Sequence, residues 1–424
     1  MRILITTDSF PPGCGGSGWS TYELARGLRV RGHDVIVVRP RPGHPDGWGE
    51  YDGFAVREIG VASPDRVPFL RNYVKNERLY ARLRPLLAQL AVDARADLVH
   101  AQHVMTIPPS VAAAAQAGVP SVATVRDYWP VCYWSDLMHD PGADGLCPGC
   151  SPAMMRRCVR PRAGAAWPLA IPLVPYMRAN LRRKQEALAQ AQRVVGVSST
   201  ITTDLLERAA GLSRDRVVTI PNPVDVAAIR AAAEAGRPGL DHPYALYLGK
   251  LAPNKGTPGL IRAIERAGLP WPLVVIGDGP DRPMVEQWAR DSRREVRLLG
   301  WLPREQALGW LAQAAVLVFP SRGPESLSRV LLEAGALGVP TAAMDTGGTR
   351  DIVIHDRTGL LSADAEALGG DVARLVADRP LALRLGAGAR AHVDATFASD
   401  RVVPRIEALY RELVHSRTSD GGEG

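Results

Sequence analysis

The chain has 424 residues, and its 51 Lys or Arg against 44 Asp or Glu give a net charge of +7. Hydrophobic residues make up 46% of the chain, which excludes intrinsic disorder and fibrous folds, and the length indicates two or three domains with their own cores. This small positive excess suits anionic small ligands or a membrane surface better than nucleic acid, which favours dense basic stripes.

The number of cysteines and the start of the chain predict that the protein is located in a reducing cytoplasm. Five cysteines are too few for a secreted disulfide framework. The opening MRILITTDSFPP reaches Asp8, Pro11 and Pro12 before a signal-peptide core can develop. Residues 98–125 carry no Asp, Glu, Lys or Arg, but prolines and a glycine divide them into elements too short to cross a bilayer. No transmembrane helix is predicted.

The first half of the chain predicts a doubly wound α/β domain. Its opening has the pattern of one βαβ unit, with a strand, a loop, a helix and a second strand at residues 2–7, 11–18, 19–31 and 35–38. Continuous apolar runs then alternate with Ala- and Leu-rich helical stretches, at 98–99, 122–125 and 194–197. Such runs are typical of a parallel sheet covered on both faces.

A second alternating series predicts a second domain of the same architecture. The stretch IPNPVD and a charged, Ala- and Gly-rich segment to Pro238 indicate a linker, with a hinge over residues 221–240. New strands are expected at 244–248, 273–276, 296–299 and 316–319. We therefore predict domains over 1–225 and 226–395, followed by a tail over 396–424 with a helix at 402–414.

The architecture predicts where a ligand binds. In open α/β sheets the ligand lies beyond the carboxyl ends of the strands. Two Rossmann-like sheets that face each other would therefore bind it in the cleft between them.

Glycines in the first loop are candidates for contact with an anion. Gly13, Gly15, Gly16 and Gly18 precede a helix, so backbone N–H groups and the positive helix end can receive a negative group. The loop lacks the Gly-x-Gly-x-x-Gly order and a Walker lysine, and a plain strand-to-helix turn is the alternative.

Two lysines in the second domain are candidates for holding a diphosphate. Lys250 and Lys255, in YLGKLAPNKG, flank a turn after a strand, where two ammonium groups can neutralise phosphates. A solvated loop is the alternative.

The segment SRGPESLSRVLLEAGALGVP places two carboxylates eight residues apart, at Glu325 and Glu333. We expect a helix to begin at Glu325, so that both carboxylates face one side and the free N–H groups of Ser326, Leu327 and Ser328 point at a phosphate or sugar oxygen. Glu333 can then accept hydrogen bonds from the vicinal hydroxyls of a ribose. A helix-capping Glu and an unrelated surface Glu are the alternative.

Two further segments are expected near the ligand. Thr346-Gly347-Gly348 breaks the chain after a strand and brings backbone amides close. In VRDYW, Arg126 can bind a phosphate or the sugar while Asp127 holds Arg126 in place, with a structural ion pair as the alternative.

These motifs resemble retaining, GT-B-type glycosyltransferases of family 4. The likeness covers nearly the whole chain, through DSFPPGCGG, DLVHAQH, VRDYWPVC, VSS, PNPVD, GKLAPNKG, IGDGP, PESLSRVLLEAGALGVP and GGTRDIV. The resemblance implies a nucleotide-diphosphate-sugar donor and a hydroxyl acceptor, which can be lipid-linked or a polysaccharide.

The resemblance also implies roles for individual residues. Lys250 and Lys255 grip the diphosphate, Glu325 contacts the donor sugar, and Glu333 holds the ribose. Gly15 and Gly16 close over the phosphates, and the C-terminal helix returns to the first domain.

This chain departs from the family at two positions. Lys250 stands where the family usually has Arg, which keeps the charge but loses bidentate geometry. Arg126 stands where the family often has His, and Arg cannot act as a general base at neutral pH. The retaining mechanism that the resemblance implies needs no such base, because the leaving phosphate can assist the incoming hydroxyl. A nucleotide-sugar-binding scaffold without turnover and a nucleotide-sugar epimerase are the alternative functions.

No Asp-x-Asp triplet occurs in the chain, so we predict metal-independent transfer with no required cofactor. Four cysteines in a predicted insertion near residues 132–160 of the first domain, Cys132, Cys147, Cys150 and Cys158, have a spacing that can seat a structural zinc ion, and reduced, packed thiols are the alternative. Residues 167–177 are apolar and lie among arginines, so they can rest on an anionic membrane and give a peripheral location at its inner face. Burial against a neighbouring helix is the alternative.

Overall fold

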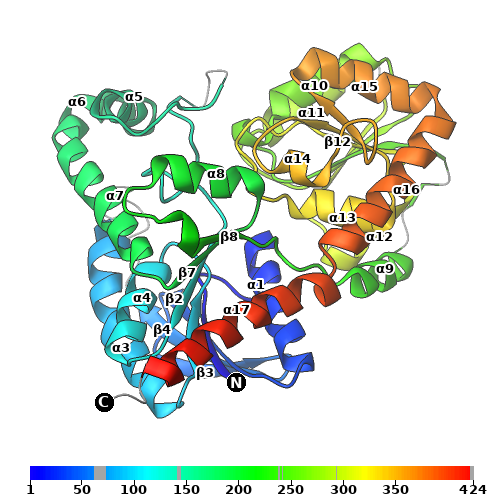
Figure 1. The fold of residues 1–424 in the computed structure, drawn as a ribbon. Coiled ribbons are helices and arrows are strands. Elements are labelled where there is room, and N and C mark those ends of the chain that lie inside the picture. The colour runs from blue at the N-terminus through cyan, green and yellow to red at the C-terminus, as the bar shows by residue number, and fades with distance from the viewer. Residues whose placement is uncertain (62–72, 141–144, 237–238, 241, 293, 421–424) are drawn as a thin grey trace. The chain divides into compact units, whose positions relative to one another are not determined.

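The computed structural model describes residues 1–424 except 62–72, 141–144, 237–238, 241, 293 and 421–424. The chain divides into two compact units (Figure 1). Unit 1 comprises Met1–Asp136, Gly149–Pro223 and Ser399–Gly424, and unit 2 comprises Leu137–Pro148 and Val224–Ala398. The cysteine-containing insertion predicted at 132–160 is thus shared between the units and not confined to the first one.

Unit 1 is built on an eight-stranded sheet with the order β3-β4-β2-β1-β5-β6-β7-β8. Neighbouring strands are parallel except for β3, which runs antiparallel to β4. The strands are β1 (Arg2–Thr6), β2 (Asp34–Pro42), β3 (Gly47–Tyr51), β4 (Phe54–Val61), β5 (Leu98–Ala101), β6 (Ser121–Val125), β7 (Arg193–Gly196) and β8 (Val217–Thr219). The predicted parallel α/β sheet is confirmed.

Both faces of the unit 1 sheet are covered by helices. Ile3 and Ile5 of β1 belong to one buried cluster, whereas Leu4, which points to the opposite face, belongs to another. Within the described residues, the α-helices of this unit are α1 (Gly16–Val30), α3 (Leu79–Asp93), α4 (Ile107–Gln116), α5 (Pro152–Ala163), α6 (Trp167–Ala170), α7 (Val174–Ala189), α8 (Ser199–Arg208) and α17 (Ser399–Asp420). Helix α1 begins three residues before the predicted start at residue 19.

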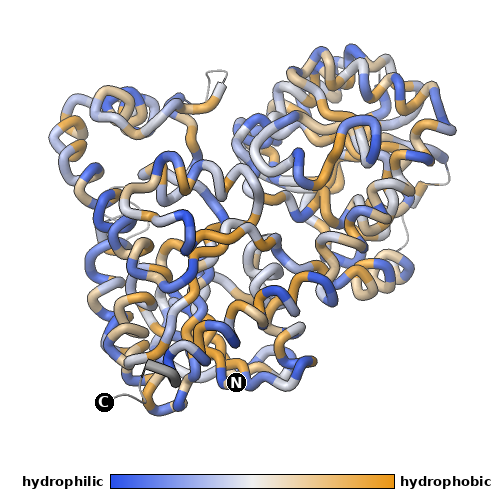
Figure 2. Tube along the Cα trace, in the orientation of Figure 1, coloured by the Kyte–Doolittle hydropathy of each residue, from blue (hydrophilic) through white to orange (hydrophobic). Residues whose placement is uncertain are grey.

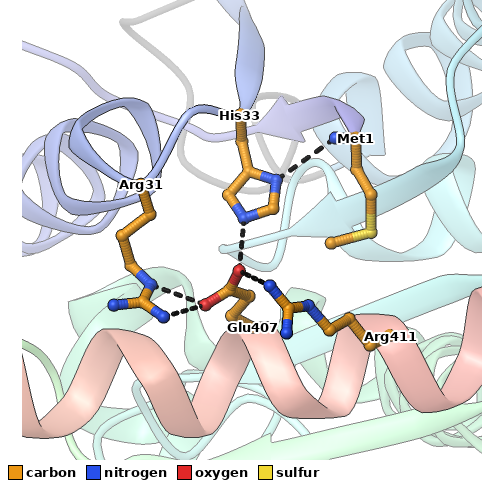
Figure 3. A network of polar contacts seen from close by, with 5 residues as sticks. All are labelled: Met1, Arg31, His33, Glu407 and Arg411. Carbon is orange, nitrogen blue, oxygen red and sulfur yellow. Dashed lines mark hydrogen bonds and ion pairs between the residues drawn. The ribbon is translucent and has the colours of Figure 1, made fainter.

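Helix α17 packs against α1 in unit 1 and is held there by a buried carboxylate (Figure 3). Glu407 accepts hydrogen bonds from Arg31 Nε at 2.5 Å, Arg411 at 2.6 Å and His33 Nε2 at 3.0 Å. The terminal ammonium of Met1 donates to His33 Nδ1, so the proton of that ring lies on Nε2 and points at Glu407. Burial alone would raise the pKa of Glu407, but the bonds from Arg31 and His33 lower it below its usual value.

Unit 2 contains a six-stranded, all-parallel sheet with the order β11-β10-β9-β12-β13-β14. Its strands are β9 (Ala245–Leu248), β10 (Leu273–Ile276), β11 (Val296–Gly300), β12 (Val316–Phe319), β13 (Thr341–Met344) and β14 (Leu360–Ser362). Its helices are α9 (Val226–Ala235), α10 (Thr257–Ala267), α11 (Arg282–Asp291), α12 (Arg304–Gln313), α13 (Arg329–Leu337), α14 (Thr349–Ile352), α15 (Ala365–Ala377) and α16 (Arg379–Thr396).

The strands of unit 2 form the centre of its core. Figure 2 shows hydrophobic residues along them, and β10 and β12 are buried throughout. Helices α10 and α15 pack side by side on one face of the sheet, where Leu260 and Leu368 join the same buried cluster. Burial of both faces explains the continuous apolar runs in the sequence.

Candidate functional site

Three loops interlock at the carboxyl ends of β9, β10 and β12 in unit 2. A Cβ atom added to Gly277 would lie 1.8 Å from the carbonyl oxygen of Gly249, and one on Gly256 would lie 1.7 Å from that of Pro320. Gly277 and Gly256 also have φ values of +135° and +76°, which L side chains disfavour. The loops therefore pack backbone against backbone and form a rigid platform.

Lys255 and Glu325 lie on two of these loops and form an ion pair. Lys255 Nζ lies 2.5 Å from Glu325 Oε1, and the hydroxyl of Ser321 donates to the same oxygen at 2.5 Å. The Glu325 side chain is 10% exposed and that of Lys255 is 36% exposed. The charge of the buried carboxylate is thus balanced, while the ammonium group stays partly open to solvent.

Lys250 lies on the loop after β9 and is exposed. Its backbone is fixed, because the hydroxyl of Tyr247 donates to the Lys250 carbonyl oxygen at 2.8 Å. Over the residues that the structure describes, the Lys250 ammonium has neither an ion-pair nor a hydrogen-bond partner. It is therefore available to an anionic ligand.

The helix expected to begin at Glu325 begins four residues later. Helix α13 starts at Arg329, with Ser328 as its extended N-cap. Ser326, Leu327 and Ser328 therefore precede the helix. The prediction that their N–H groups lie in its first turn is wrong. The reason lies in the loop: the Gly348 N–H donates to the Glu325 carbonyl oxygen at 2.6 Å and holds this segment out of the helix. The same bond brings the predicted Thr346–Gly348 turn next to Glu325.

Glu333 lies within α13 and is buried, with two arginines around its carboxylate. Its Oε1 atom lies 2.7 Å from Arg304 and 3.1 Å from Arg329 Nε. A ribose that forms hydrogen bonds with Glu333 would therefore share the carboxylate with Arg304 and Arg329.

In unit 1, Gly15 is the N-cap of α1 and Gly16 is the first residue of this helix. Both are exposed, and a Cβ atom on Gly15 would meet no atom within 4 Å. The first turn of α1 contains no acidic residue. The helix start is therefore uncovered within unit 1, as an anion-binding role requires.

Arg126 follows β6 and is buried, held by residues other than the predicted one. Its Nε donates to Asn222 Oδ1 and its NH1 to Thr21 Oγ1, both at 2.8 Å. Burial lowers the pKa of Arg126 to about 9, so the side chain remains mainly protonated at neutral pH. Arg126 is a fixed cation.

Asp127 does not hold Arg126 as predicted. Its Oδ1 accepts a hydrogen bond from the Trp129 backbone N–H at 2.9 Å, which turns the carboxylate back onto its own loop. Burial raises the pKa of Asp127 to about 6, against the opposing effects of this bond and of Lys184. Lys184, on α7, is also buried, and burial lowers its pKa to about 8.

Two buried polar residues after β5, Gln102 and His103, are not among the site residues predicted from the sequence. The Nδ1 atom of His103 lies 2.9 Å from the hydroxyl of Thr7 and accepts from the Asp8 backbone N–H at 3.4 Å, so Nε2 carries the proton. Burial, then the charge of Arg126, holds the pKa of His103 well below its usual value. His103 Nε2 and both polar atoms of the Gln102 side chain have no partner among the described residues. Their position directly after the strand in DLVHAQH is the sequence feature that could have identified them as site residues.

Three of the four cysteines, Cys132, Cys150 and Cys158, lie close together in unit 1, whereas Cys147 belongs to unit 2. A hydrogen bond with Cys132, and then burial, raise the pKa of Cys150, and Cys158 lies close enough to contribute. Cys147 is buried. Across the part of the chain that the structure describes, no three or more His, Cys, Asp or Glu side chains are grouped to hold a metal ion. The zinc hypothesis thus gains no support from the geometry.

The segment at 167–177 is only partly exposed. Val174 and Met177 are buried in a cluster with Met155 and Val159, as the alternative of burial predicted, whereas Leu169 is 83% exposed. Among the described residues, no helix has the length and apolarity needed to cross a bilayer.

Residues 14–228 match the family model described as Glycosyltransferase Family 4, and residues 242–378 match the one described as Glycosyl transferases group 1. The chain is 27% identical to a glycogen synthase of Mycobacterium tuberculosis, over 97% of this chain and 94% of that protein. It is 28% identical to a GDP-mannose-dependent alpha-mannosyltransferase of Mycolicibacterium smegmatis, over 96% of this chain and 98% of that protein.

Among solved structures, Anabaena HepE in complex with UDP matches with a TM-score of 0.67 and 18% identity, over 97% of this chain and all of that one. The likeness shows the two-domain α/β fold of GT-B glycosyltransferases. The family matches, the relatives and this fold agree with the motifs of the sequence. The chain therefore belongs to glycosyltransferase family 4 and is a glycosyltransferase.

Proposed function

We propose that this enzyme moves a sugar from a nucleotide-diphosphate sugar to a hydroxyl acceptor, with retention of anomeric configuration and without a metal ion. The observation that carries the proposal is the group of Lys250, Lys255 and Glu325 on the interlocked loops of unit 2. Two ammonium groups on a rigid platform are suited to balance the charge that develops on a leaving diphosphate. The absence of an Asp-x-Asp triplet from the sequence supports a metal-free site.

In this proposal, the site residues of unit 2 bind different parts of the donor. Lys250 and Lys255 bind the diphosphate, and Lys255 can do so because its side chain is 36% exposed although it is paired. Glu325 contacts the donor sugar, and Glu333 accepts hydrogen bonds from the ribose hydroxyls.

The transfer step breaks one bond and forms another on the same face of the sugar. The bond between C1 and the phosphate oxygen breaks, and its electron pair stays on the diphosphate. The acceptor oxygen bonds to C1, and its proton passes to the phosphate oxygen that has just been released. No side chain has to act as general base, so Arg126 is free to serve as a fixed cation for an anionic group.

Unit 1 supplies the other half of the proposed chemistry. Gly15 and Gly16 close over the donor phosphates with the amides of the α1 start. Asp127 lies next to Arg126 in a buried loop and fixes the position of Trp129 through its backbone. The residues after β5 and β6 are proposed to receive the acceptor.

The names of similar proteins leave the donor base open, because one relative is GDP-mannose-dependent and a structural neighbour holds UDP. A thermal-shift screen of UDP-, GDP- and ADP-sugars identifies the donor, since a ligand that binds only the folded state raises its stability with concentration. The donor found is then incubated with hydroxyl acceptors, and glycosylated product is sought by mass spectrometry.

We expect product with wild type in EDTA and a large loss of turnover in Glu325→Gln. Tight donor binding without product from any acceptor would instead support a nucleotide-sugar-binding scaffold. Turnover lost in EDTA and restored by magnesium would contradict the metal-free mechanism.

A further inference from the structure

Residues 149–185 of unit 1 contain eight Arg or Lys and no Asp or Glu. In the chain as a whole, acidic residues nearly balance basic ones, so this segment is a local concentration of positive charge. None of the residues given a role in sugar transfer lies in this segment. Its charge therefore needs a separate explanation.

Helix α5 presents this charge on one face. Met155 and Val159 are buried against α7, whereas Arg156, Arg157 and Arg160 are exposed. In a helix, residues separated by three or four positions lie on the same face, so the three guanidinium groups are neighbours. Among the described residues none of the three forms an ion pair.

An apolar turn continues this basic face. The turn over residues 164–170 contains α6, and Leu169 within it is 83% exposed. Pro168 beside it is also exposed. The guanidinium of Arg160 lies 5.7 Å from the centre of the Trp167 ring, so the basic face and the apolar turn are contiguous. Figure 1 shows α5 and α6 at the outer end of α7, away from the sheet of unit 1.

We propose that the outer face of α5 and the turn at residues 164–170 form a docking surface for an anionic lipid bilayer. Arginines held at the level of the headgroups attract anionic lipid, and an exposed leucine and proline enter the boundary of the acyl chains. Nucleic acid would satisfy the charge but would leave Leu169 and Pro168 in water. The combination of charge and apolar surface thus favours the membrane.

The proposal does not depend on the sugar-transfer chemistry, and its test measures binding alone. Purified full-length protein is sedimented with vesicles of phosphatidylcholine and with vesicles that also contain phosphatidylglycerol, at low and high salt. We expect binding to the anionic vesicles only, and weaker binding at high salt.

Two variants separate the charged and apolar parts of the surface. Removal of three charges in R156Q/R157Q/R160Q should weaken binding to anionic vesicles on the order of 100-fold. Leu169→Ser should weaken it several-fold at both salt concentrations, because the leucine contribution is not screened. All four side chains are exposed, so both proteins should keep the wild-type melting temperature.

R182Q/R183Q is the matched control, because these arginines lie on α7 and are paired with Glu186 and Glu77. This control should bind like wild type. Failure of wild type to bind anionic vesicles, or an equal loss in the control, would overturn the proposal. Salt-sensitive binding to duplex DNA that Leu169→Ser leaves unchanged, with no binding to vesicles, would point to nucleic acid instead.

Discussion

Replacing Lys255 should weaken nucleotide binding, whereas replacing its partner Glu325 should not. Glu325 and a bound diphosphate would compete for the Lys255 ammonium, which lies 2.5 Å from Glu325 Oε1. Lys255→Ala removes a cation from the proposed phosphate site, so affinity should fall. Glu325→Gln keeps the shape but releases Lys255 to the phosphate, so affinity for a free nucleoside diphosphate should stay equal or rise.

The size of the effect follows from the pair. Two unit charges 4 Å apart interact by about 4 kcal/mol at an effective dielectric constant near 20. Because Lys255 is 36% exposed, solvent screening should reduce its interaction with a phosphate to about 1.4 kcal/mol, which is a tenfold change in Kd. Turnover of Glu325→Gln should nevertheless fall about 100-fold or more, as for other removed transition-state contacts.

Isothermal titration with UDP, GDP and ADP measures affinity, and product formation measures turnover. Arg379→Gln is the control, because Arg379 is an exposed cation of unit 2 that lines a cavity near residues preceding β12 and β13. It should change neither quantity. These roles are contradicted if Glu325→Gln loses as much nucleotide affinity as Lys255→Ala, or if Glu325→Gln turns over at the wild-type rate.

Three further predictions concern other parts of the molecule. Gly256→Ala places a Cβ atom 1.7 Å from the Pro320 carbonyl oxygen, so it should destabilise unit 2 by about 3 kcal/mol or more and weaken nucleotide binding. Chemical denaturation measures the stability and titration measures the binding. An unfolding curve like that of wild type would contradict this prediction. Asn222→Ala removes a hydrogen-bond partner of Arg126, so turnover should fall about tenfold while the Kd of the nucleotide stays constant. An equal loss of nucleotide affinity would argue against a role of Arg126 on the acceptor side. Glu407→Gln should lower the stability of unit 1 by about 2 kcal/mol at neutral pH. Because the pKa of Glu407 is lowered in the folded protein, its contribution is present above the unfolded pKa and is lost as pH falls through the folded one. Melting curves of the two proteins should therefore converge in acid, and a constant difference would contradict the assignment.

Much of the fold could be predicted from local pattern. Strands such as β10 and β12 are continuous apolar runs, because both faces of their sheet are buried. Prolines and glycines mark the loops between them. The α/β class and the strand positions follow from these short-range signals.

The details of the site depended on contacts that are distant in sequence. The spacing predicts a helix start at Glu325, but the Gly348 N–H, 23 residues on, holds Glu325 in a loop. Adjacency in sequence favours a pair between Asp127 and Arg126, whereas the partners of Arg126 are Thr21 and Asn222, 105 and 96 residues away. Side-chain pairing across strands is a tertiary property that one sequence does not encode locally.

Local sequence also does not show which cation of a basic run is buried. Lys184 belongs to a basic run in the sequence, yet it is buried while Arg182 and Arg183 beside it are exposed. A helical run of charges does not reveal which member faces the core, because that depends on the neighbouring helix. The structure separates the buried lysine from the exposed arginines.

The anomeric configuration of the product, measured by NMR in the presence of EDTA, tests the central claim most directly. We expect an α-linked donor to give an α-linked product at a rate that EDTA does not change. A β-linked product would contradict retention. A rate that falls to background in EDTA and returns with magnesium would contradict charge balance by Lys250 and Lys255.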